Sequence, residues 1–168
     1  SVVYLVEGNP NQVVDLQKEF DNVVHHRVPD PFPFNDATFN VVHCSHLVEH
    51  LQPEDVYKLM GEIDRCLAPN GYLIISAPLL WEGFYNDLSH VRPYPPQIFL
   101  NYLCSPSKER TRPVLSQKYD PVELRYRYTW ELVPYVNISN YHRWIQRLLF
   151  VVVRWLRKRN LSIYRRTG

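Results

Sequence analysis

Residues 31–78 read PFPFNDATFNVVHCSHLVEHLQPEDVYKLMGEIDRCLAPNGYLIISAP, and this stretch decides the fold. The β-branched run at residues 39–42 predicts a strand, and apolar residues at helical spacing after it predict a helix. The turn sequence Ala68-Pro69-Asn70-Gly71 then leads into a second apolar run at residues 72–76. Strand, helix, turn and strand in this order predict one right-handed crossover unit of a parallel sheet.

Shorter patterns on either side extend this unit. The continuous apolar run at residues 2–6 is typical of a strand that is buried on both faces. The other predicted elements are a helix at 13–20, a weak strand at 23–26, a short helix at 96–103, a strand at 122–133 and a final helix at 140–159. Alternating helices and strands place the chain in the α/β class.

The composition is that of a globular protein. The chain has 168 residues, of which 45% are hydrophobic and 21% charged, enough for one domain with a single core. Its three cysteines show no CxxC spacing, which argues against a disulfide framework and indicates reduced thiols in a cytoplasmic protein.

Charge divides the chain into two parts. Residues 141–168 carry eight Lys and Arg side chains and no acid, whereas the remainder carries a net charge of −6. We therefore expect an α/β domain at 1–140 and a basic C-terminal helix and tail at 141–168. The apolar run at 148–153 is too short to span a bilayer, so residues 141–159 either lie on a membrane surface or pack on the sheet. Nucleic-acid binding is unlikely without a known module.

The sequence of residues 31–78 resembles that of a known protein family. PFPFNDATFNVVHCSHLVEHL … EIDRCLAPNGYLIISAP resembles the middle of class I S-adenosylmethionine-dependent methyltransferases, and the resemblance covers residues 4–100. It implies a doubly wound, mostly parallel Rossmann-like sheet. The family's first strand and G-x-G-x-G loop precede the segment that begins at Ser1, so we expect both to be missing from this chain. A second copy or a partner chain would then cover the bared strand.

The same resemblance implies S-adenosylmethionine as the cofactor. Val6-Glu7-Gly8-Asn9-Pro10 is similar to the family's V-[DE]-x-x-P segment, which implies that Glu7 accepts the ribose hydroxyls beside Gly8 and Asn9. Cys44-Ser45-His46 would line the cofactor, largely through backbone atoms. Alternatively, Glu7 only stabilises the start of the next helix.

A second segment points to the acceptor. Asp87-Leu88-Ser89-His90-Val91-Arg92-Pro93-Tyr94 resembles the D-P-[ST]-H-x-R-x-[FY] segment of a methyltransferase subgroup associated with polysaccharide and lipid-linked sugar biosynthesis. The resemblance implies His90 as a general base oriented by Asp87, with Arg92 and Tyr94 binding the acceptor. The alternative is a loop held by its own Asp–His–Arg contacts, with no dedicated base.

A competing motif overlaps the deciding stretch. His46-Leu47-Val48-Glu49-His50 spells H-x-x-E-H, in which both histidines would bind zinc from one helix face with Glu49 as base. No downstream residue stands out as a third ligand, so we expect no metal. The predicted function is methyl transfer to oxygen of a saccharide or other small polar acceptor, free or lipid-linked. The alternatives are a non-catalytic methyltransferase-like module that acts through protein association and, remotely, a zinc peptidase.

Overall fold

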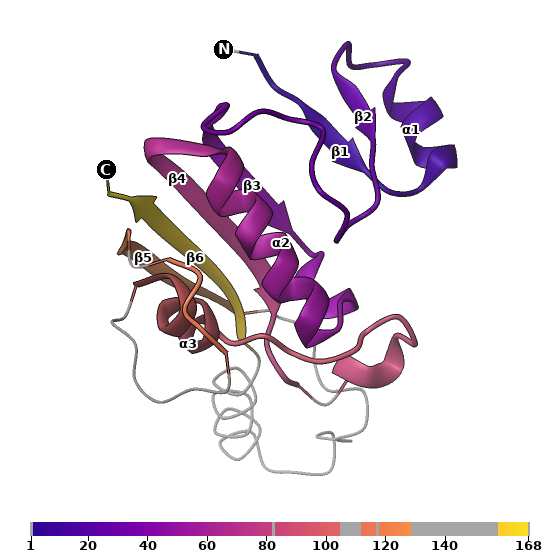
Figure 1. Cartoon of the computed structure of the whole chain (residues 1–168). Helices are drawn as coiled ribbons and strands as arrows, with labels where there is room; N and C mark the ends of the chain where they lie inside the picture. The colour runs from indigo at the N-terminus through magenta and orange to yellow at the C-terminus, as the bar shows by residue number, and fades with distance from the viewer. Residues whose placement is uncertain (1, 82, 105–111, 117, 129–157, 168) are drawn as a thin grey trace, which may run out of the picture.

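The computed structural model describes residues 2–81, 83–104, 112–116, 118–128 and 158–167. In this part of the chain six strands form two sheets with helices packed on them (Figure 1). Strands β1 (Leu5–Glu7) and β2 (Val23–His25) form a parallel pair joined by helix α1 (Pro10–Leu16). The larger sheet has the order β3-β4-β6-β5.

The predicted crossover unit is confirmed. Strand β3 (Phe39–Ser45) pairs in parallel with β4 (Leu67–Pro78), and helix α2 (Pro53–Cys66) connects them. The buried positions of α2 recur at helical spacing, so one apolar face of this helix packs on the sheet; they are Val56, Leu59, Met60, Ile63 and Cys66. The predicted turn at 68–71 appears as an irregularity at the start of β4, where Asn70 has a φ of 63°.

The second half of the large sheet is antiparallel. Strand β6 (Lys158–Arg166) lies between β4 and β5 (Tyr119–Tyr128) and runs antiparallel to both. The described part of β5 confirms the late strand predicted from alternation at 122–133. The predicted final helix is wrong at its end, because Lys158 and Arg159 belong to β6, where they pair with neighbouring strands. The rest of that helix and the domain boundary at 140/141 lie outside the described residues.

The prediction that residues 2–6 form a strand buried on both faces is wrong. Strand β1 is shorter than the apolar run, and Val3 is 66% exposed. Among the described residues β1 pairs only with β2, so its other edge and flanking residues stay accessible. Tyr4 connects the two sheets through edge-to-face ring contacts with Phe34, at 5.5 Å between centroids, and with Phe39, at 5.9 Å.

One core holds the larger sheet together. It lies between the sheet and α2, with helix α3 (Pro96–Phe99) and the π-type turn Leu100–Cys104 beside β5 and β6 (Figure 1). Its largest members come from both halves of the sheet and include Leu73 of β4, Tyr119 of β5 and Tyr164 of β6. The described residues contain no helix long and apolar enough to cross a membrane. The predicted α/β class is confirmed.

Candidate active site

The sequence-predicted cofactor residues lie where two parallel strands end. In Figure 1 the arrows of β1 and β3 point the same way, so Glu7 and Ser45 close their strands at the same edge of the molecule. Ligands of open α/β sheets bind beyond the carboxyl ends of the strands, because the loops and helix N-termini gather there. This edge is therefore the candidate site.

Glu7 organises the turn that follows β1. Its Oε1 accepts a hydrogen bond from the backbone N–H of Asn9 at 2.7 Å, and Asn9 in turn caps α1 by accepting from Asn11 N–H at 3.0 Å. A Cβ added to Gly8 would come no closer than 3.5 Å to the carbonyl oxygen of His26. Glu7 therefore stabilises the start of α1 through Asn9, as the alternative proposed. The same hydrogen bond holds the Glu7 carboxylate at the end of β1.

Residues 44–46 end β3 in a sharp bend. His46 has a φ of 49° and its N–H donates to the carbonyl oxygen of Ser76, at the end of β4, at 2.8 Å. Cys44 is buried, and burial together with the charge of Glu49 raises the pKa of its thiol to about 12. Cys44 therefore remains a neutral thiol, while Ser45 and His46 are exposed at the edge.

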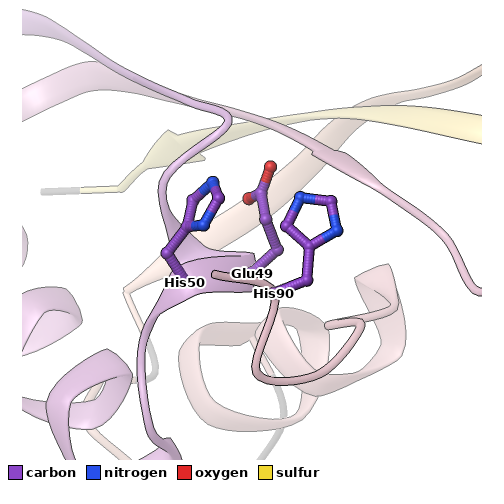
Figure 2. Close-up of side chains that lie close together, drawn as sticks. All are labelled: Glu49, His50 and His90. Carbon is purple, nitrogen blue, oxygen red and sulfur yellow. The ribbon is translucent and has the colours of Figure 1, made fainter. Parts of the chain in front are cut away.

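Because of this bend, the H-x-x-E-H motif does not have the helical structure of a zinc-peptidase motif. The motif does not form an α-helical turn, since a short 3₁₀ turn covers only Val48–His50 and His46 precedes it in a left-handed conformation. His46 and His50 consequently do not share one α-helical face, and the geometry of the zinc-peptidase motif is not present. The side chains that come together are instead Glu49, His50 and His90 (Figure 2).

Figure 2 shows the carboxylate of Glu49 between the two imidazole rings. One nitrogen from each ring and one carboxylate oxygen all lie within 4.8 Å of one another, and the ring centroids are 4.9 Å apart. The backbone N–H of Val91 donates to the carbonyl oxygen of Glu49 at 2.8 Å, so the loop that carries His90 is attached directly to the turn after β3. Local sequence patterns do not pair Glu49 and His50 with His90, because 41 and 40 positions separate them from it in the sequence.

The predicted acceptor residues are only partly brought together. The imidazole of His90 is oriented by Phe84, whose carbonyl oxygen lies 2.6 Å from Nδ1, and not by Asp87 as the resemblance implied. Asp87 Oδ2 lies 4.0 Å from the other nitrogen, Nε2, while its Oδ1 accepts hydrogen bonds from Ser89. These hydrogen bonds lower the pKa of Asp87, so the carboxylate is charged at neutral pH.

Arg92 and Tyr94 face a different space. They line an apolar cavity of about 330 Å³ between α2, α3 and the segment at 112–115. Tyr94 is buried and its hydroxyl donates to the carbonyl oxygen of Leu51 at 2.8 Å, so it acts as a core residue in place of the acceptor-binding group expected. Arg92 lies 5.4 Å above the Tyr94 ring, a cation–π distance.

Residues 1–75 match the model of the family described as Methyltransferase domain. A SAM-dependent methyltransferase from Archaeoglobus fulgidus is 18% identical, with a TM-score of 0.62 and coverage of 96% of this chain and 74% of that one. The Haloferax volcanii protein solved in complex with the Trm112 methyltransferase activator is 14% identical, with a TM-score of 0.63 and coverage of 97% and 71%.

The Burkholderia thailandensis 1,6-didemethyltoxoflavin-N1-methyltransferase, solved with 1,6-didemethyltoxoflavin and S-adenosylhomocysteine bound, is 14% identical at a TM-score of 0.56, covering 97% of this chain and 60% of that one. No curated protein matches the chain. At these identities the solved structures establish the fold, which is the Rossmann-like α/β fold of methyltransferases. The resemblance to class I methyltransferases is confirmed by the family model and by the fold.

Proposed function

We propose that this chain works as an S-adenosylmethionine-dependent methyltransferase that transfers the methyl group to an oxygen of a saccharide or another small polar acceptor. The observation that carries the proposal is the acidic side chain fixed at the carboxyl end of β1 in a methyltransferase fold. When bound, the cofactor supplies an electrophilic methyl group on a sulfonium centre. The protein's part is to hold the acceptor oxygen in line with that methyl group.

The residues at the β1 end fit the ribose of such a cofactor. A carboxylate can accept hydrogen bonds from two vicinal hydroxyls, and the Asn9 N–H keeps the Glu7 side chain in place. Gly8 and Asn9 bring backbone close to the same position. Across the edge, Cys44, Ser45 and His46 would border the cofactor through their backbone.

The acceptor side rests on the loop from Phe84 to Tyr94. With Nδ1 donating to Phe84, the neutral His90 ring keeps its lone pair on Nε2, which can take the proton of an acceptor hydroxyl. Asp87 Oδ2, 4.0 Å from that nitrogen, would place a negative charge near the transferred proton. Arg92 lines the neighbouring cavity between α2 and α3, so it would attract an anionic group of the acceptor, such as the phosphate of a lipid-linked saccharide, there and away from His90.

The surroundings of the enzyme are part of the same proposal. A cytoplasmic enzyme for a lipid-linked acceptor would benefit from contact with a membrane surface through the basic residues at 141–159, most of which lie outside the described residues. A second copy or a partner chain would cover the edge of β1 that has no strand partner among the described residues. A non-catalytic module that acts through such association is the alternative.

Calorimetric titration of the whole chain with S-adenosylhomocysteine tests the cofactor site. We expect binding that Glu7→Ala weakens by about 10- to 100-fold, the effect of losing charge-assisted hydrogen bonds. Glu7→Gln, which keeps an acceptor for the Asn9 N–H, should also weaken binding. The control is Glu19→Ala, an exposed acid beyond α1 that should bind like wild type. A folded chain that binds no S-adenosylhomocysteine would favour the non-catalytic module.

A further inference from the structure

The buried carboxylate of Glu49 has one ion-pair partner in the described part of the chain, the imidazole of His46. The Glu49 side chain is 1% exposed, and neither oxygen accepts a hydrogen bond from the residues that the structure describes. The nearest basic atom is His46 Nδ1, 3.3 Å from Oε1 on a half-exposed ring. Burying a carboxylate that accepts no hydrogen bond is costly, and a bound cation would offset that cost.

Both histidines beside Glu49 are held in a tautomer that can bind a metal through Nε2. His90 Nδ1 donates to the carbonyl oxygen of Phe84 at 2.6 Å, and His50 Nδ1 donates to the carbonyl oxygen of Ser89 at 3.2 Å. Each neutral ring therefore carries its lone pair on Nε2. Metal-binding histidines nearly always donate their other N–H to a carbonyl or carboxylate, which fixes the ring and its tautomer.

The three side chains are also close enough to share one ion. Their ligand atoms lie within 4.8 Å of one another, whereas the ligand atoms of a tetrahedral zinc centre are roughly 3.3 Å apart. Binding an ion would therefore require the three side chains to move closer together. Asp87, whose Oδ2 is 4.0 Å from His90 Nε2, adds a second negative charge near His90.

We propose that Glu49, His50 and His90 bind one divalent cation of the zinc type. Two imidazole nitrogens and one carboxylate oxygen suit a borderline ion such as Zn²⁺ better than Mg²⁺ or Ca²⁺, which prefer oxygen. The ion neutralises Glu49 and joins the turn after β3 to the loop at 84–92. It uses the same lone pair of His90 as the proposed base, so a chain with bound metal lacks that base.

Titration of the whole metal-free chain with ZnCl₂, followed by calorimetry, tests this site without any methyl donor or acceptor. We expect one Zn²⁺ per chain and a higher melting temperature with the ion bound. His90→Gln, His50→Gln and the nearly isosteric Glu49→Gln should each weaken binding at least about 10-fold. Co²⁺ should give visible absorption bands of a low-coordinate site in wild type and lose them in His90→Gln.

The matched control is His43→Gln, which removes an exposed imidazole from neighbouring β3 and should leave zinc affinity unchanged. The proposal is overturned if the folded chain binds no zinc, or if His90→Gln binds it as tightly as wild type. It is also overturned if only His46→Gln abolishes binding, because His46 would then be the ligand. The outcome is independent of cofactor binding, which Glu7 variants report separately.

Discussion

At the residue scale, Arg65 joins α2 to the loop before β3. Its guanidinium donates to the carbonyl oxygens of Phe32 at 3.1 Å and Phe34 at 2.8 Å, and to the carboxylates of Asp36 and Glu62 at 2.8 Å each. Only a planar group with several fixed donors can hold four acceptors in this way. The loop at residues 32–36, which has no regular secondary structure, is thereby fixed against the helix.

Replacing Arg65 by Met should lower the free energy of unfolding by about 1–3 kcal/mol, because the half-buried Glu62 and two carbonyl groups lose their partner. Urea denaturation at neutral pH measures the loss. The control is Arg125→Met, which breaks a pair with Glu123 on a side chain that is 70% exposed and should change stability by less than about 0.5 kcal/mol. Equal losses in the two variants would contradict the assignment.

The same contact predicts a pH dependence. Hydrogen bonds from Arg65, and secondarily from the Phe32 N–H, hold the pKa of Glu62 below its ordinary value of 4.5. A lowered folded-state pKa stabilises the protein above that ordinary value, and this contribution is lost as the pH falls through the folded-state pKa. The stability difference between wild type and Arg65→Met should therefore shrink below about pH 4.5.

The residue types predicted features that depend on neighbouring residues better than contacts between residues far apart in the sequence. The strand-end position of Glu7 follows from local pattern, since a carboxylate after a short apolar run marks the end of a strand. The cluster of Glu49 and His50 with His90 could not be predicted, because it depends on how a loop 40 residues later folds back. The H-x-x-E-H motif instead suggested His46 as a metal ligand. The backbone of His46 is left-handed, so this residue is not part of a helix with His50.

At the element scale, the crossover unit depends on the close approach of Gly71 to two carbonyl oxygens. A Cβ at Gly71 would lie 2.9 Å from the carbonyl oxygen of Ala68 and 3.0 Å from that of Asn40 in β3. Such contacts are too short for a methyl group, and backbone cannot move aside as a side chain can. Gly61, in the middle of α2, is different, since its Cβ would only meet Leu115 Cδ2 at 3.8 Å.

The same substitution should therefore have opposite effects at these two glycines. Gly71→Ala should lower the free energy of unfolding by about 1–3 kcal/mol through crowding of β3 against β4. Gly61→Ala should raise it by about 0.5–1 kcal/mol, because alanine restricts the unfolded chain and favours the helix. Thermal and urea denaturation of the two variants give the signs. Stabilisation by Gly71→Ala would show that the start of β4 is looser than the structure indicates.

Helices and strands in which apolar residues recur at regular spacing could be predicted from the sequence. The strands with which they pair could not. The 3.6-residue spacing of buried side chains identified α2, and the alternation near residue 124 identified β5. The pattern of residues 158–166 does not predict a strand. This basic segment forms one because it pairs with β4 and β5. Arg166 also joins β6 to α2 through donation to the carbonyl oxygen of Asp64 at 2.7 Å.

At the scale of the whole molecule, the two sheets differ in how they are supported. Strand β4 has partners on both sides and a buried inward face, and β6 and α2 close the core around it. Strand β1 has one partner in the described part of the chain and exposed apolar neighbours such as Val3. The pattern of residues 2–6 alone predicted burial, because a run of apolar residues does not show how many strands pair beside it.

This difference predicts two levels of protection in native-state hydrogen exchange. Amides of β4 should exchange only through global unfolding, because every route to them opens the core. Amides of β1 and β2 should exchange earlier, through local opening that leaves the larger sheet intact. Raising urea within the folded range should accelerate β4 exchange strongly and β1 exchange weakly, since global opening exposes more surface. Equal protection and equal urea dependence in the two sheets would mean that they unfold as one unit.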